Sequence, residues 1–213
     1  MGKVIMLSDV RCSFVVVGEP KEYKTGDGKW RWSATPLVPY DNPQKQQVDT
    51  TIREVAAEKW GGKAGKVLET VLNDRKACAW LDGKHKDYEG YEGHYYLSAY
   101  RYKKAGPPAV MTRDKRPIYY RGDKLKIPAG IDPEVCVLNQ PYPGLDGAIY
   151  SGAYCNLQVE IYALDDANGK QIRATLLGIQ FWRHGDAFGG GRAPDENAFA
   201  LAEDAGEADD MAS

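Results

Sequence analysis

Residues 151–184, with the sequence SGAYCNLQVEIYALDDANGKQIRATLLGIQFWRH, decide the fold class of this chain. Small and apolar residues occupy every second position in the first half of this stretch, namely Ala153, Cys155, Leu157, Val159, Ile161 and Ala163. Such an alternation is typical of a strand with one buried and one exposed face. Asn168-Gly169 then provide a tight turn, and residues 171–184 return as a second strand. The stretch therefore predicts a long β-hairpin.

Similar strand patterns precede this hairpin. The apolar and aromatic residues predict further strands at residues 3–17, 29–39, 94–103 and 118–121. Pro20 and the Gly26-Asp27-Gly28 segment indicate a turn between the first two of them. Five or six turn-rich strands fit a small closed or partly closed barrel, and a β-sandwich is the competing architecture.

The hydrophobic period changes between the early and the late strands. Asn42-Pro43 is typical of a helix start, because asparagine caps the first turn and proline suits the first helical position. Apolar residues then follow at spacings of three and four, namely Val48, Ile52, Val55, Ala56 and Trp60. Gly61-Gly62 ends this helix, and residues 66–73 indicate a shorter second one. We therefore expect a helical insertion over about residues 43–73 that covers one end of the sheet.

Charge is distributed unevenly along the chain. Its 213 residues carry 28 Lys and Arg against 30 Asp and Glu, but the last nineteen residues contain seven acids and no base. The rest of the chain, with 28 bases and 23 acids, therefore has a net charge of about +5, which favours a polyanionic ligand. We expect one domain over residues 1–188, then a Gly-rich linker and an acidic, disordered tail at 189–213. The tail acids that we predict to compete with the ligand and to bind partners are Asp195, Glu196, Glu203, Asp204, Glu207, Asp209 and Asp210.

Aromatic and basic residues concentrate together in the middle of the chain. Residues 84–126 contain eleven Lys and Arg, five acids and eight of the fourteen tyrosines, and residues 29–32 (KWRW) form a second group. Rings stack on unpaired bases, and cations neutralise phosphates. A duplex hides its base faces, so this combination favours a single strand over a duplex.

The candidate binding residues follow from this pattern. In residues 94–103, the tyrosines alternate with the small apolar residues, which predicts an outward row of rings at Tyr96, Tyr100 and Tyr102. We predict base stacking by Trp30, Trp32, Tyr96, Tyr100, Tyr102 and Tyr119. We predict phosphate contacts by Arg31, Arg101, Lys103, Arg116 and Arg121. The competing interpretation is packing within the fold for each ring and a plain solvated charge for each base.

Sequence signals for other classes of protein are weak. The chain contains no GxSxG, P-loop or HExxH motif, so we expect no catalytic residues and no cofactor. Four cysteines and three histidines lack metal-site spacing, so we expect no metal and reduced cysteines in the core. No stretch approaches the ~20 consecutive apolar residues of a membrane span. The start lacks the features of a signal peptide, so we also expect no export.

Four segments in a fixed order carry a family resemblance. They are residues 32–39 (WSATPLVP), 95–99 (YYLSA), 150–156 (YSGAYCN) and 189–192 (GGGR), and an acidic end follows them. Over most of its length the chain resembles the bacteriophage single-stranded DNA-binding proteins. The resemblance implies an OB-fold barrel with a helical insertion, and sequence-independent binding of single-stranded DNA in phage replication and recombination, in the cytoplasm of an infected bacterium. It also implies a homodimer in many members, strand annealing, and phage or host replication proteins as partners of the tail.

Some choices remain open at the level of sequence. The tail ends in Asp-Asp-Met-Ala-Ser, without the terminal aromatic residue of the best-studied relatives, so we expect electrostatic competition rather than docking of a terminal ring. Stacking and phosphate contacts serve RNA as well as DNA. The alternative function is that of a protein-interaction module in a replisome or virion, which would bind its protein partner through the tyrosine face. A nuclease or phosphoesterase would need a carboxylate cluster that the sequence does not supply.

Overall fold

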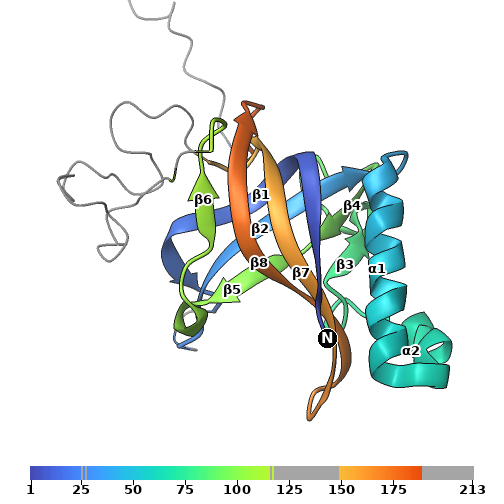
Figure 1. The fold of residues 1–213 in the computed structure, drawn as a ribbon. Helices are drawn as coiled ribbons and strands as arrows, with labels where there is room; N and C mark the ends of the chain where they lie inside the picture. The colour runs from blue at the N-terminus through green and yellow to red at the C-terminus, as the bar shows by residue number, and fades with distance from the viewer. Residues whose placement is uncertain (25, 27, 116, 118–148, 189–213) are drawn as a thin grey trace, which may run out of the picture.

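The computed structural model describes residues 1–24, 26, 28–115, 117 and 149–188, and the strands in these ranges form one mixed sheet (Figure 1). These strands are β1 (Lys3–Glu22), β2 (Trp30–Pro39), β3 (Trp80–Asp82), β4 (His94–Leu97), β5 (Ala99–Tyr102), β6 (Ala109–Met111), β7 (Tyr154–Asp166) and β8 (Gly169–Arg183). The helices are α1 (Pro43–Trp60) and α2 (Ala64–Val71), with short 3-10 segments η1 (Gly61–Lys63), η2 (Gly83–His85) and η3 (Lys103–Ala105).

Five of the strands close the sheet into a ring. β1 pairs with β7, β7 with β8, β8 with β5 and β5 with β2, and β2 returns to β1. These pairs are antiparallel except β5–β8, where Ala99 and Tyr100 lie opposite Ala174 and Thr175. The ring is not a regular barrel, because the β1–β2 pairing shifts register twice and the β5–β8 contact is short. One closed sheet excludes the two-sheet sandwich, and the predicted OB-fold-like barrel is confirmed.

The β7–β8 hairpin shows the alternation that the sequence predicts. Leu157, Val159 and Ile161 point inward and are fully buried. Asp166 and Gly169 are the last facing pair, so two residues form the loop. Gly169 has a φ of 89°, a left-handed conformation that glycine adopts without steric cost. This hairpin supplies two of the five strands that close the ring.

The helical insertion also begins where the sequence predicts. The Asn42 side chain accepts a hydrogen bond of 2.9 Å from the Gln44 amide, and Pro43 is the first helical residue. The predicted apolar face is buried, as shown by Val48, Ile52, Val55, Ala56 and Trp60. Figure 1 shows α1 standing beside the ring, where it packs against β7, with α2 at its lower end. The insertion at about residues 43–73 is confirmed, although α2 begins at Ala64 rather than at residue 66.

Other boundaries differ from the prediction. Pro20 lies inside β1, which continues to Glu22, so the turn begins later than expected. The strand predicted at residues 94–103 is divided at Ser98 into β4 and β5, and the Ser98 amide donates to the Ala79 carbonyl at 2.8 Å. The strand predicted at residues 118–121 and the tail at 189–213 lie outside the described residues.

The core contains the cysteines that the structure describes. Cys12, Cys78 and Cys155 are free and buried, which confirms that these three lie in the core as predicted. Burial raises the pKa of the Cys78 thiol to about 11, so it stays neutral at physiological pH. Cys136 lies outside the described residues. In the described ranges, no helix has both the length and the apolar character that a membrane crossing requires.

Candidate nucleic-acid interface

The outer face of β2 and β5 carries several of the rings and cations predicted from the sequence. Ala34 of β2 is buried in the core, so Arg31 and Ser33 point to the opposite side of the strand. On β5, Tyr102 lies opposite Arg31, and Tyr100 lies opposite Ser33. Residues directly opposite each other share one face of a sheet. The four side chains therefore form one surface on the outside of the ring.

Arg31 lies at the centre of this surface. Its guanidinium carbon is 3.9 Å from the centroid of the Tyr23 ring and 4.9 Å from that of the Tyr100 ring. Tyr100 in turn meets the Tyr102 ring edge-on, with 5.3 Å between centroids. Cation–π contacts orient a guanidinium while leaving the N–H donors at its edge available. Within the described part of the chain Arg31 forms no ion pair, so these donors can bind an anion.

The β7–β8 hairpin borders the same surface. Tyr162 and Arg173 lie opposite each other on β7 and β8. Both act electrostatically on the pKa of the Tyr100 phenol, which Tyr162 raises and Arg173 lowers. Burial, with smaller contributions from the neighbouring tyrosines, raises the pKa of Tyr100 to about 12. The phenol is therefore neutral at physiological pH and does not repel phosphate. Sequence reasoning missed Tyr162 and Arg173, because only closure of the ring brings them beside Tyr100. It also missed Tyr23, which follows β1 directly and contacts Arg31.

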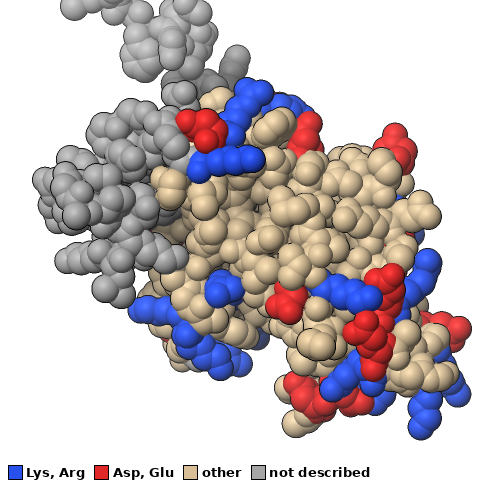
Figure 2. Space-filling view, viewed as in Figure 1, with Lys and Arg blue, Asp and Glu red and all other residues tan. Residues whose placement is uncertain are grey.

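Trp30 and Lys103 lie at the end of the β2–β5 pair, where the alternation along β2 places Trp30 on the side of the strand opposite Arg31. The Trp30 side chain is 44% exposed, and Lys103 Nζ lies 5.8 Å from the centroid of its ring. Arg101 donates from Nε to the Gly106 carbonyl at 2.7 Å and from Nη2 to the Ala105 carbonyl at 2.8 Å, which holds the η3 turn in place. Its role in phosphate binding stays a prediction. Figure 2 shows basic side chains predominating at the lower left, where β5 and η3 lie in Figure 1, whereas acids and bases are mixed around the helices.

The structure corrects the prediction that Trp32 presents an open ring. Trp32 is only 7% exposed, and its indole Nε1 donates a hydrogen bond of 2.7 Å to the Gly18 carbonyl. The physical reason is the alternation along β2, which turns Trp32 away from the face that carries Arg31. Stacking on Trp32 would require displacement of its packed neighbours.

The prediction of an outward row of three tyrosines is wrong at Tyr96. Tyr96 lies opposite Leu37 and therefore on the predicted side of the sheet, but it is only 8% exposed. A second small hydrophobic cluster, which also contains Tyr91 and Phe188, covers it. Tyr91 meets the Tyr96 ring edge-on at 5.1 Å. Tyr100 and Tyr102 are half-buried, so the exposed part of the row is restricted to β5.

Other predicted residues cannot be placed. Tyr119, Arg116, Arg121 and the seven acids of the tail lie outside the described residues. In the residues that the structure does describe, no group of three or more His, Cys, Asp or Glu side chains converges as metal ligands would.

Five strands form a closed sheet in OB-fold-like order, and aromatic and basic side chains lie together on the outer face of two of these strands. This combination is typical of nucleic-acid-binding proteins. A family model described as the single-stranded DNA-binding protein of Enterobacter phage Enc34 matches residues 3–212. The chain belongs to this family. The match confirms the resemblance found in the sequence and places the chain among binding proteins rather than enzymes.

Individual relatives agree with this assignment. The chain is 33% identical over 189 residues to protein p50 of Acyrthosiphon pisum secondary endosymbiont phage 1, covering 88% of this chain and 87% of that protein. The solved single-stranded DNA-binding protein of phage Enc34 matches with a TM-score of 0.60 and 20% identity, covering 92% and 89% of the two chains. Its complex with single-stranded DNA matches with a TM-score of 0.61 and 21% identity, covering 88% and 89%. The gp2.5 single-stranded DNA-binding protein of bacteriophage T7 matches with a TM-score of 0.52 and 13% identity over both full chains. At these identities the structural matches establish a shared fold.

Proposed function

We propose that this protein binds single-stranded DNA without sequence preference along the outer face of β2 and β5. The observation that carries the proposal is Arg31, held between the rings of Tyr23 and Tyr100 on a surface that also presents Tyr102. Rings of this kind stack on bases for about 1–3 kcal/mol each, and cations gain affinity by releasing counterions from phosphates. Family membership supports DNA as the ligand, since the Enc34 relative was solved in complex with single-stranded DNA.

The chemistry of the surface also supports selection by strandedness rather than by sequence. Every base has a π face, so stacking on Tyr100 or Tyr102 tolerates any base. A duplex offers phosphates to Arg31 and Lys103 but no free base faces to the rings. We therefore expect a single strand to bind more tightly than a duplex of equal length.

A fluorescence titration tests the proposal. The full-length protein is mixed with oligo-dT, with an RNA of matched length and with a matched duplex, each at a low and a high salt concentration, and tryptophan emission is followed. We expect quenching and tight binding with oligo-dT, weaker binding to the duplex and a steep loss of affinity with salt. Equal affinity at both salt concentrations would contradict the phosphate contacts. A failure of oligonucleotides to quench the tryptophans would favour the protein-interaction module instead.

We further propose that the acidic tail competes with DNA and recruits phage or host replication proteins. Gly189, where the linker begins, directly follows Phe188, which is buried beside Tyr91 and Tyr96 on the same side of the sheet as the DNA surface. Arg11 lies over the Phe188 ring, with its guanidinium carbon 4.0 Å from the centroid. The described part of the chain that precedes the tail therefore ends at Phe188, on the side of the sheet that carries the proposed DNA surface.

The cellular role that we propose follows from the family. A protein that covers single strands would act in phage DNA replication and recombination, in the cytoplasm of an infected bacterium. We propose that residues 1–188 form one domain and that the protein is a homodimer. Sedimentation of the full-length protein over a range of concentrations tests the dimer, and a single monomeric species would contradict it.

A further inference from the structure

A second group of aromatic rings and a cation lies on the outside of the ring, at positions that the sequence did not single out. Phe14 of β1 is 43% exposed, and Tyr88, in the loop between η2 and β4, is 38% exposed. Their ring centroids are 4.9 Å apart, and the ring planes are inclined by 38°. Large exposed rings that touch each other make a poor surface in the absence of a ligand.

The backbone directs Phe14 outward. The β1–β2 register shifts between Ser13 and Val16, so Phe14 lies in a bulge. Its φ is 48°, in the left-handed region that bulky residues rarely adopt. Bulges of this kind re-aim a side chain, and an aromatic residue held in a strained conformation indicates a functional constraint. Here the bulge leaves the Phe14 ring partly exposed on the outside of the sheet rather than buried in the core.

Lys86 provides the cation of this group. Its Nζ atom lies 4.3 Å from the centroid of the Phe14 ring, 4.1 Å from that of Tyr91 and 4.8 Å from that of Tyr96. Within the described residues it forms no ion pair, although Asp87 and Glu89 belong to the same loop. A half-buried ammonium that contacts ring faces and has no ion-pair partner among the described residues lacks a compensating anion. This position therefore attracts a negatively charged ligand.

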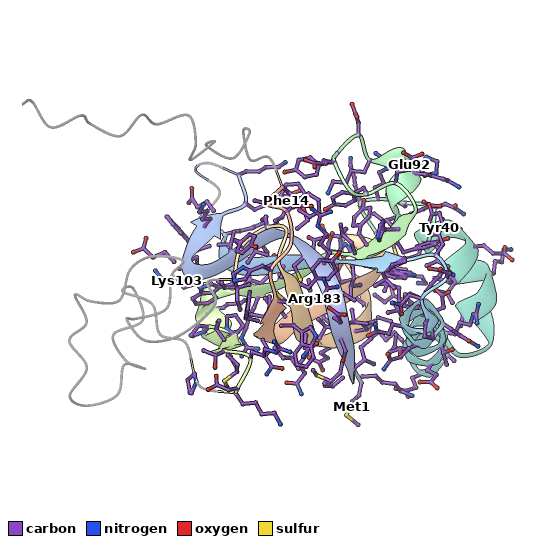
Figure 3. All side chains as sticks on the ribbon, turned by 90° about the horizontal axis from the view of Figure 1, so that it is seen from above. Met1, Phe14, Tyr40, Glu92, Lys103 and Arg183 are labelled. Atoms are coloured by element: carbon purple, nitrogen blue, oxygen red, sulfur yellow. The ribbon has the colours of Figure 1, made fainter. Side chains whose placement is uncertain are left out.

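This group continues the surface formed by β2 and β5. The Ser33 hydroxyl donates a hydrogen bond of 3.1 Å to the Phe14 carbonyl, and Ser33 lies opposite Tyr100. Figure 3 shows Phe14 between Lys103 on one side and Glu92 on the other. A nucleic-acid strand that runs from Arg31 along Ser33 therefore reaches Phe14.

We propose that Phe14, Tyr88 and Lys86 form a second subsite for the same single-stranded nucleic acid, in which a base stacks on the exposed Phe14–Tyr88 pair and an adjacent phosphate binds the Lys86 ammonium. The inference rests on the proposed function, because it extends the same strand beyond the β2–β5 surface. It adds a requirement of length, since only an oligonucleotide that spans both surfaces occupies both.

Oligonucleotides of two lengths test the subsite in the full-length protein. OB folds bind about 4 to 16 nucleotides, so oligo-dT at these two limits covers one surface or both. We expect Phe14→Ala and Tyr88→Ala each to lower affinity for the long oligonucleotide by about 5- to 150-fold, which is the range for loss of one stacked base. We expect little change for the short one. Arg31→Ala, in contrast, should weaken both.

The outcomes separate the two proposals. If Arg31→Ala weakens binding of both lengths while Phe14→Ala changes neither, the second subsite is wrong and the proposed function stands. If none of these variants changes binding, both proposals are wrong. Tyr40 is the matched control, because it is 43% exposed and lies beyond Glu92 in Figure 3. An equal loss in Tyr40→Ala, or tighter binding in Phe14→Ala, would overturn the subsite, the latter by indicating that another part of the chain occupies the rings.

Discussion

The Ser33 hydroxyl donates a hydrogen bond of 3.1 Å to the carbonyl oxygen of Phe14. This bond joins the bulge of β1 to β2, where Ser33 lies on the same side of the strand as Arg31. Ser33 also lies opposite Tyr100 of β5. The position of the Phe14 ring relative to the β2–β5 surface is therefore set by paired strands and not by a loop. Side chains that the backbone holds in place lose little conformational entropy when a ligand binds. This preorganisation favours a continuous track for one nucleic-acid strand.

The first prediction concerns the cation at the centre of the β2–β5 surface. Replacing Arg31 by Ala removes one phosphate contact and the support of the Tyr23 and Tyr100 rings. We expect weaker binding to all oligonucleotide sequences by a similar factor, and a slope of log affinity against log salt that is shallower by about 1. Fluorescence titrations at several salt concentrations provide the measurement.

Two further variants control this experiment. Lys66, which is exposed on α2, allows removal of one positive charge away from the surface, and Lys66→Ala should leave the salt slope unchanged. Arg31→Lys keeps the charge but loses the planar stacking group, so its affinity should lie between those of the wild type and Arg31→Ala. An unchanged salt slope in Arg31→Ala would show that Arg31 does not contact phosphate.

The second prediction concerns the acidic tail. Deleting residues 195–213 removes seven acids and changes the formal net charge from −2 to about +5. We expect tighter binding to single-stranded DNA and less dependence on competing anions, because the tail no longer competes for the basic surface. A tail of the same length with Asn and Gln in place of the seven acids should behave like the deletion. Unchanged or weaker binding by both variants would refute electrostatic competition.

Local sequence patterns were sufficient to predict most of the secondary structure. The alternation in residues 151–164 and the Asn42-Pro43 cap each depend on neighbours in the chain, and both predictions were confirmed. The strand pattern predicted a barrel but not the order of its strands, because the parallel contact between β5 and β8 joins residues 75 positions apart, Ala99 and Ala174. Periodicity alone does not specify such a contact.

The candidate site was harder to predict for a related reason. Tyr96 does lie on the predicted face of the sheet, but Tyr91 and Phe188 cover it, and Phe188 lies more than ninety residues away in the sequence. The exposure of Phe14 depends on a bulge that contains no glycine, so the usual sequence signal of a bulge is absent. Burial and bulges are consequences of the assembled fold, which explains why the two rings were misjudged or missed.

The third prediction concerns the pH dependence of DNA binding. Burial among the rings of Phe14, Tyr91 and Tyr96 lowers the pKa of Lys86 to about 8, from its ordinary value of 10.5. Burial also raises the pKa of Tyr91 and of Tyr96, so these phenols remain neutral as the pH rises. Phosphate binds the protonated lysine. We therefore expect affinity for a long oligonucleotide to fall between about pH 7 and pH 9, as Lys86 loses its proton.

An arginine substitution provides the control for this pH effect. Arginine stays charged throughout this range, so Lys86→Arg should remove most of the pH dependence while retaining binding at pH 7. The same lysine affects folding in the opposite direction. Because its pKa is lower in the folded chain than in the unfolded chain, its contribution to the free energy of unfolding should increase as the pH rises from about 8 toward 10.5. An identical pH profile for wild type and Lys86→Arg would exclude Lys86 as the titrating group.

The fourth prediction separates a functional ring from a structural one. At a φ of 48°, Phe14 has a conformation that costs a bulky residue about 1–3 kcal/mol, and asparagine adopts it more readily. Phe14 is 43% exposed and packs against Tyr88, so its replacement removes part of one ring contact while it relieves the backbone strain. We expect Phe14→Asn to have a urea unfolding midpoint equal to or higher than that of the wild type, together with weaker binding to a long oligonucleotide.

Tyr88→Asn is the matched variant, because Tyr88 is similarly exposed but does not have a positive φ. It should lose affinity for the long oligonucleotide without any gain in stability, since no backbone strain is relieved there. A lower unfolding midpoint in Phe14→Asn than in Tyr88→Asn would show that the Phe14 ring supports the fold rather than the ligand. We expect Phe14→Asn to keep the stability of the wild type and to lose affinity for the long oligonucleotide. This result follows only if the strained backbone of β1 presents the Phe14 ring to the ligand.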